Sequence, residues 1–210
     1  MDLNSMNFWQ VILAGGPVMW PIILCSVLAL AVILERLFYF KSIKIDISSV
    51  LGAILDQIKR HQIKEAVQLC DKISHPLAHI LKAGILKYDR PRSQIKEAID
   101  GAFLYEIPKL EKNLPVLATI AHIAPLLGLL GTVAGMVRCF QAVSAKSASF
   151  NIITVSDLSG GIWEALLTTV AGLAVAVPAY VAYNYIVSLV NNAILDMEKS
   201  AAELINFLAE

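Results

Sequence analysis

Charged side chains are scarce in this sequence of 210 residues: only 16% are Asp, Glu, Lys or Arg, whereas 57% are hydrophobic. The mean hydropathy of +0.67 lies outside the range of soluble globular domains. Basic and acidic residues number 17 each, so the net charge gives no indication of a nucleic-acid partner. The composition predicts an integral membrane protein.

Cysteine is also scarce, and Cys25, Cys70 and Cys139 form no CxxC or Cys/His group. This spacing argues against a disulfide framework and against a metal site. The sequence has no HExxH motif, no GxSxG motif and no paired aspartates in a hydrophobic run. We therefore expect neither an intramembrane enzyme nor a bound cofactor or metal.

Three runs without Lys, Arg, Asp or Glu are long enough to cross a membrane, which takes about 20 residues. They contain 18, 22 and 31 residues and span Pro17–Leu34, Val116–Val137 and Ala165–Leu195. We expect transmembrane helices over 17–40 and 116–137, and over 164–195 a third that extends into the cytoplasm. Because residues 1–16 contain no Lys or Arg and Glu35 and Arg36 end the first run, that run is expected to stay as an anchor.

Lysine and arginine are strongly sorted along the chain. Residues 1–16 have none, 41–115 have thirteen, and the stretch between the second and third runs has two, Arg138 and Lys146. The positive-inside rule then places 1–16 and the 138–163 loop outside, and 41–115 and the tail 196–210 in the cytoplasm.

The 41–115 region is expected to be helical, because its apolar residues recur at spacings of three and four. Pro76 and Pro91 fit helix starts, and a long helix from Gln94 is expected to run into the second span with bends at Pro108 and Pro115. The predicted fold class is an all-α integral membrane protein with three transmembrane helices and long helical cytoplasmic extensions.

Small residues in the spans indicate close helix packing. Gly128, Gly131 and Gly135 lie in the second run and Gly172 in the third. Such residues let helix backbones approach closely, so the two spans are expected to pack against each other or against copies of themselves. Packing of small residues around a pore would give the same pattern.

Polar side chains in these spans are the candidates for an ion pathway. Thr132 lies five residues before Val137, and Thr169 lies five after Glu164, so both hydroxyls are expected about 7 to 8 Å inside the outer boundary. Each threonine could instead bond its own helix, and Glu164 could simply stabilise a helix start. Neither span has an Asp or Glu at mid-depth, so a second protein is expected to supply the missing carboxylate.

Three further residues are secondary candidates: Thr168 for the pore, and Pro125 and Pro178 as pore or hinge positions. His122 is interpreted as a structural, hydrogen-bonded side chain near the cytoplasmic interface rather than as a proton relay.

Two blocks carry a family resemblance. The segments APLLGLLGTV at 124–133 and IWEALLTT at 162–169, followed by AVPAY at 176–180, resemble the MotA/TolQ/ExbB proton-channel family. The length and the three spans look like ExbB or TolQ rather than the four-span MotA. Trp163 and Thr168 depart from the expected pattern and leave ExbB and TolQ both open.

The resemblance implies a homopentamer in the bacterial inner membrane, with a periplasmic N-terminus, around an ExbD/TolR-like partner whose single transmembrane helix carries a proton-binding aspartate. A TonB- or TolA-like protein would then carry work across the periplasm, driven by the proton motive force. Thr132 and Thr169 match the family's pore-lining threonines and Glu164 its glutamate. A non-conducting membrane scaffold that organises partner helices is the alternative.

Overall fold

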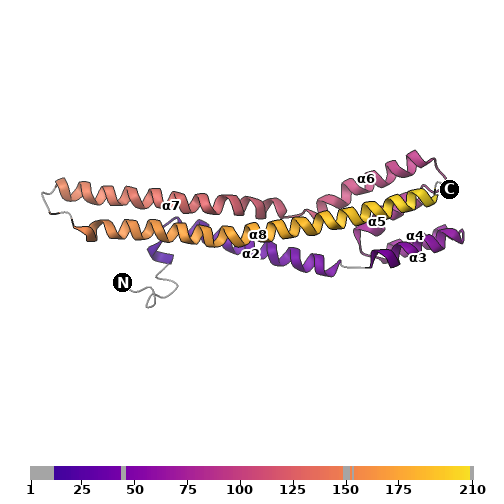
Figure 1. Cartoon of the computed structure of the whole chain (residues 1–210), viewed down its shortest axis with the longest axis horizontal. Coiled ribbons are helices and arrows are strands. Elements are labelled where there is room, and N and C mark those ends of the chain that lie inside the picture. Colours follow the sequence, from indigo (N-terminus) through magenta and orange to yellow (C-terminus); the bar gives the residue numbers. More distant parts are fainter. Residues whose placement is uncertain (1–11, 44–45, 149–151, 153, 209–210) are drawn as a thin grey trace. The chain divides into compact units, whose positions relative to one another are not determined.

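The computed structural model describes residues 12–43, 46–148, 152 and 154–208, and these form helices without strands. Most of the predicted N-terminal segment 1–16 lies outside the described residues. In chain order the helices are α2 Met19–Ser42, α3 Ile47–Lys59, α4 Ile63–Lys72, α5 Pro76–Ile85, α6 Arg92–Leu110, α7 Leu114–Ala148 and α8 Val155–Leu208 (Figure 1).

Three of these helices are long and apolar enough to cross a membrane, over Met19–Ser42, Leu114–Ser147 and Leu158–Leu208. The predicted all-α fold with three spans is therefore confirmed. The chain divides into two compact units: unit 1 comprises Met1–Glu35 and Asn113–Asn184, and unit 2 comprises Arg36–Lys112 and Tyr185–Glu210.

The expectation of a loop over 138–163 is wrong. Helix α7 continues to Ala148 and α8 begins at Val155, so most of this segment is helical. The stretch 138–148 becomes more polar but contains neither Gly nor Pro, so nothing in it stops a helix. The end of an apolar run marks a change of surroundings and not the end of the helix.

The expected long helix from Gln94 into the second span is also interrupted. Helix α6 ends at Leu110 and α7 begins at Leu114. Between them Asn113 has a φ of 63°, a left-handed conformation that asparagine tolerates better than most residues. Pro115 then falls in the first turn of α7, where its missing N–H costs no helical hydrogen bond.

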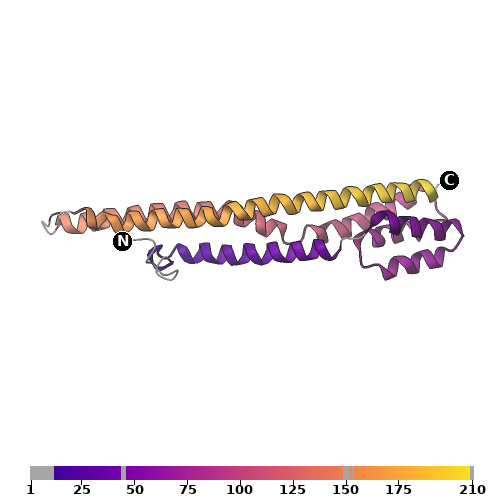
Figure 2. The same cartoon turned by 60° about the horizontal axis from the view of Figure 1, so that its bottom comes forward.

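Unit 1 contains two antiparallel helices, α7 and the first part of α8, that lie side by side (Figures 1 and 2). The first part of α2 borders α8 at a small cavity of about 170 Å³ around Pro178. Pro125 and Pro178 both lie inside continuous helices, so the backbone passes each proline without a break. This unit holds the candidate residues of the ion pathway.

Unit 2 is a helical cluster in which Pro76 occupies the first position of α5 and Pro91 directly precedes α6, as predicted. Some of its apolar side chains are fully buried and form a core, among them Ile54, Leu77, Leu81, Ile95 and Leu204. A Cβ on Gly84 would lie 2.8 Å from Ile99 Cδ1 and 3.3 Å from Leu204 Cδ2, so α5, α6 and the end of α8 meet here. These contacts explain why the predicted extensions fold as one helical body.

Candidate ion pathway

The contact between α7 and α8 is a seam of small residues. A Cβ added to Gly128 would lie 3.1 Å from Thr168 O and from Thr169 Cα. One added to Gly135 would lie 2.5 Å from Gly161 O, and one on Gly172 would lie 2.6 Å from Ala124 O. Real Cβ atoms essentially never approach to 2.5 or 2.6 Å and seldom to 3.1 Å, so the glycines allow backbone-to-backbone packing of the two helices.

Thr168 belongs to this seam and not to an open face. Its side chain is fully buried, and a Cβ on Gly131 would overlap it. The Oγ1 donates to Glu164 O at 3.1 Å or to Ala165 O at 2.9 Å, so its hydrogen-bonding need is met within α8. The secondary pore role expected for Thr168 does not fit this position; it is a packing residue.

Thr132 and Thr169 lie on one edge of the α7–α8 pair and are partly exposed. Thr132 comes four residues after Gly128 and three before Gly135, and Thr169 stands in the same relation to Ala165 and Gly172. Each threonine is thus rotated about 40 to 60° from the seam, in the same sense when each helix is viewed from its own N-terminus. Because the two helices are antiparallel and face each other, both threonines then lie on the same side of the α7–α8 pair.

The two hydroxyls are staggered along this edge rather than level. Thr169 Oγ1 lies 3.4 Å from Gly128 O, which places it at Gly128, about 6 Å and one turn from Thr132. Each also donates within its own helix, Thr132 to Leu129 O at 2.6 Å and Thr169 to Ala165 O at 3.2 Å. The expected single depth is therefore wrong by about a turn, because the glycine contacts set the register and the ends of the charge-free runs do not.

Glu164 is buried at the end of the seam nearest the connection from α7 to α8, where its carboxylate accepts a hydrogen bond from Arg138 of α7 in an ion pair. Gly16, at a φ of 66°, lies against the same carboxylate, and a Cβ there would overlap it. The Arg138 side chain is 44% exposed and that of Glu164 only 10%. The arginine therefore links a buried carboxylate to the open surface.

Sequence reasoning missed both partners of Glu164. A usable signal existed for Arg138, because it is the first charge after the second run and Glu164 is the charge directly before the third. Antiparallel helices bring these two ends together. No comparable signal marks Gly16.

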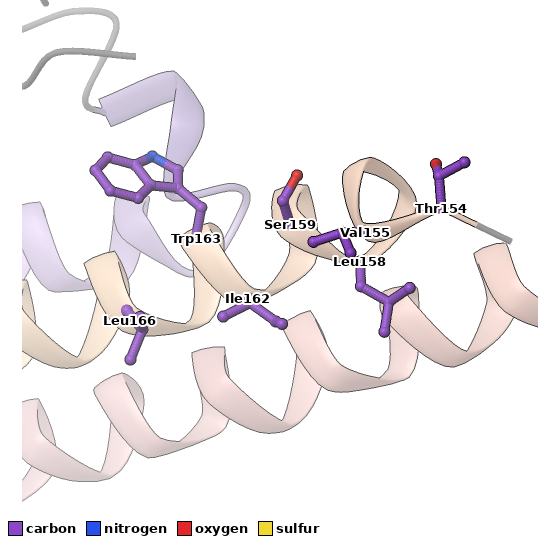
Figure 3. Close-up of a pocket in the computed structure, with 7 residues that line it drawn as sticks. All are labelled: Thr154, Val155, Leu158, Ser159, Ile162, Trp163 and Leu166. Carbon is purple, nitrogen blue, oxygen red and sulfur yellow. The ribbon is translucent and has the colours of Figure 1, made fainter.

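An apolar groove of about 500 Å³ runs along the start of α8, next to Glu164 in sequence. In Figure 3, Trp163 and Ser159 leave α8 on a different side from Ile162 and Leu166. The lining also includes Thr154, Val155 and Leu158, with no charged side chain among these residues. The groove suits an apolar segment and offers no route for a proton.

A polar cluster lies in unit 2, outside the spans. Glu106 is buried and accepts hydrogen bonds from Lys109 Nζ at 2.6 Å and from His79 Nδ1 at 3.1 Å. Burial raises the pKa of the Glu106 carboxyl, but these two hydrogen bonds together with the charges of Lys109 and His79 outweigh burial, so the net pKa is lowered. The pKa of His75 is lowered by burial and then by the charge of His79, and its Nδ1 accepts from Leu77 N at 3.0 Å as a cap of α5.

Within the described residues no group of three His, Cys, Asp or Glu side chains could hold a metal ion.

The sequence profile of the MotA/TolQ/ExbB proton channel family matches residues 72–199, more than half of the chain. The chain belongs to this family. It is a multi-pass membrane protein of a channel family and not of an enzyme family.

Individual relatives agree with the family match. Over 197 residues the chain is 27% identical to an ExbB homologue of Methanothermobacter thermautotrophicus, covering 91% of this chain and 68% of the relative. It is 33% identical over 170 residues to the biopolymer transport protein exbB1 of Vibrio cholerae, covering 78% and 72%. It is 42% identical over 100 residues to the Tol-Pal system protein TolQ of Haemophilus influenzae, covering 46% and 42%.

The region matched to the MotA/TolQ/ExbB family includes the edge threonines Thr132 and Thr169, the ion pair of Arg138 and Glu164, and the glycine seam. The geometry that distinguishes this site thus lies inside the family region. The resemblance to ExbB and TolQ seen in the two sequence blocks is confirmed.

Proposed function

We propose that this chain is the proton-conducting, stator-like subunit of an inner-membrane complex that uses the proton motive force to drive a TonB- or TolA-like protein. Five copies surround the single transmembrane helices of an ExbD/TolR-like partner. The partner's aspartate carries the proton along the Thr132 and Thr169 edge. The complex would use this energy for uptake across the outer membrane or for the integrity of the cell envelope.

The observation that carries this proposal is the polar edge next to a seam of small residues. The seam fixes α7 against α8, so the two hydroxyls keep their places on one side of the pair. The runs 116–137 and 165–195 contain no carboxylate. A hydroxyl can solvate a carboxylic acid in either protonation state but cannot carry a net charge itself, so the carboxylate that carries the proton past these hydroxyls has to come from a partner helix.

Assembly into a homo-oligomer follows from the exposed surface of the same helices. Large side chains on α7 and α8 are open, among them Leu126, Leu129, Val133, Leu173 and Val177. The small residues of the seam are already buried in the contact between α7 and α8 within one chain. Neighbouring copies, the partner helix and lipid are the surfaces proposed to cover the remainder, with the N-terminus periplasmic and the C-terminus cytoplasmic.

A non-conducting scaffold is the second candidate, and one observation favours it. Both threonine hydroxyls donate to carbonyls of their own helices, which is what structural threonines do. A scaffold predicts that these hydroxyls can be removed without functional loss. Proton flux separates the two functions.

The test is proton flux in liposomes that contain the chain and its single-span partner. Thr132→Val and Thr169→Val keep the side-chain shape and remove the hydroxyl, and each should lower flux about tenfold or more, the equivalent of roughly one hydrogen bond. Thr119→Val is the matched control, because Thr119 also donates to its own helix, to Pro115 O at 2.7 Å, but is rotated about 140° from Thr132. Normal flux in both edge variants, with the partner bound, would establish the scaffold.

A further inference from the structure

A second polar pair lies on the same side of unit 1, farther from the ion pair of Arg138 and Glu164, with His122 rotated about 80° from Thr132 around α7. The rings of His122 on α7 and Tyr180 on α8 form an edge-to-face contact, with centroids 6.5 Å apart and planes at 86°. Both side chains are exposed in the single chain. Tyr180 is eleven residues from Thr169, which returns it to within about 20° of the same helix face.

The exposure of His122 has a physical consequence in a membrane helix. The residue lies six positions inside the apolar run that starts at Val116, or about 9 Å along the helix. A polar imidazole is costly against lipid, and such residues in membrane helices normally face a water-filled path or a protein partner. On this ground we expect the edge that carries His122 to face the lumen, the partner helix or a neighbouring copy of the chain.

The hydrogen bond of His122 determines which ring nitrogen can exchange a proton. Nδ1 lies 2.7 Å from Ala118 O, and a carbonyl oxygen can only accept, so Nδ1 carries a hydrogen. In the neutral ring Nε2 then has a free lone pair. A proton can bind at Nε2 and leave from Nε2 while the Nδ1 bond stays intact.

The position of this pair fills a gap in the proposed pathway. His122 lies ten residues from Thr132, or about 15 Å along α7, toward the end opposite Arg138. A proton released by a partner carboxylate near Thr132 needs an intermediate acceptor over that distance. His122 is the sole histidine in residues 114–184. In the part of unit 1 that the structure describes, Tyr180 is the titratable group that faces His122, and His122 takes part in no ion pair.

We propose that His122 is a proton-accepting residue of the pathway on the cytoplasmic side, with Tyr180 holding the ring on the polar edge. The proton passes from the partner's carboxylic acid through water to Nε2, and from Nε2 to cytoplasmic water. This inference rests on the proposed function and adds to it a titratable exit step. It revises the interpretation of His122 as a purely structural side chain.

The experiment measures proton flux in liposomes of stated orientation that contain the chain and its single-span partner, at constant driving force, while the pH on the cytoplasmic side is varied. Flux through the unmodified complex should fall as the pH on that side is lowered, because an imidazole that carries hydrogens on both nitrogens cannot accept another proton. His122→Gln keeps a hydrogen-bonding side chain and His122→Phe keeps the ring. Both should lose about tenfold in flux and should lose this pH dependence.

Controls separate the outcomes. His79→Gln, at a histidine of α5 outside the spans, should retain wild-type flux and pH dependence. If both His122 variants bind partner and keep wild-type flux and pH profile while Thr169→Val loses flux, the inference is overturned and the proposed function stands. If Thr132→Val and Thr169→Val also conduct normally, the proposed function itself fails.

A measurement without substitution covers the case in which the His122 variants do not assemble. In the unmodified complex with ¹⁵N-labelled histidine, nitrogen resonances report the protonation of each ring. One ring assigned to the spans should titrate in response to the pH on the cytoplasmic side. A His122 resonance that does not respond to pH on that side would overturn the inference.

Discussion

The glycine seam makes a sharp prediction because two adjacent glycines of α8 differ in their surroundings. A Cβ on Gly161 would lie 2.5 Å from Cys139 Sγ and 2.6 Å from Gly135 O, whereas a Cβ on Gly160 would meet nothing within 4 Å. Ordinary van der Waals contact is about 3.5 to 4 Å. The Cys139 side chain can rotate away, but the Gly135 carbonyl is fixed in α7, so Gly161→Ala must push the helices apart by roughly 1 Å.

The magnitude follows from two opposing effects. Overpacking a tight contact costs about 1 to 3 kcal/mol. Replacing Gly by Ala in a helix gains about 1 kcal/mol, and this gain applies to both positions. Gly161→Ala is therefore expected to be less stable than Gly160→Ala by about 1 to 3 kcal/mol, or about 5- to 150-fold in the folding equilibrium.

The assay is equilibrium unfolding of the purified chain in mixed micelles, with a distance probe between α7 and α8 as the second readout. Gly160→Ala should match or slightly exceed the stability of the unmodified chain, and Gly161→Ala should fall below it and show a wider helix separation. Equal stability of the two alanine variants would refute the close backbone contact between Gly161 and Gly135.

Two further predictions concern charged groups. Arg138→Gln should destabilise unit 1 and reduce proton flux, because it leaves the buried Glu164 without its cation. The double variant Arg138→Gln/Glu164→Gln should recover much of the lost stability in thermal melts. A double variant as unstable as Arg138→Gln would count against the ion pair. Glu106→Gln should flatten the acid dependence of stability, because the lowered pKa of Glu106 means that its contribution to stability is present above pH 4.5 and is lost as pH falls through the lower folded-state pKa. Thermal melts of this variant between pH 5 and 3 should therefore differ from those of Glu97→Gln, a control at an exposed position of α6. Equal pH profiles of the two variants would contradict this role of Glu106.

The spans and the fold class could be read from the sequence because membrane crossing depends on the length of a charge-free run, which is a one-dimensional property. Helix ends could not be read in this way. Residues 138–148 are polar enough to end a span but have no residue that ends a helix, and the break at Asn113 depends on one left-handed residue.

The candidate site shows a similar division. Thr132, Thr169 and Glu164 could be chosen because polar groups in apolar runs stand out. Separating Thr168 from Thr169 requires knowing which face of α8 packs on α7, although the four-residue spacing of Thr168 and Gly172 was an available clue. The pairing of Arg138 with Glu164 depends on helix register, for which the sequence offers only the clue that these two charges flank the second and third charge-free runs.

The left-handed residue between α6 and α7 has a consequence for the evolution of this chain. Asn113 combines a φ of 63° with a side-chain amide that donates to Glu35 Oε2 at 2.5 Å. Glycine would accept the backbone conformation but has no amide, and aspartate would place a second carboxylate against the first. Other side chains would strain the turn. Replacement of Asn113 by Gly or Asp is thus expected mainly where position 35 also changes, so the two positions should covary in an alignment even though 77 residues separate them in the chain.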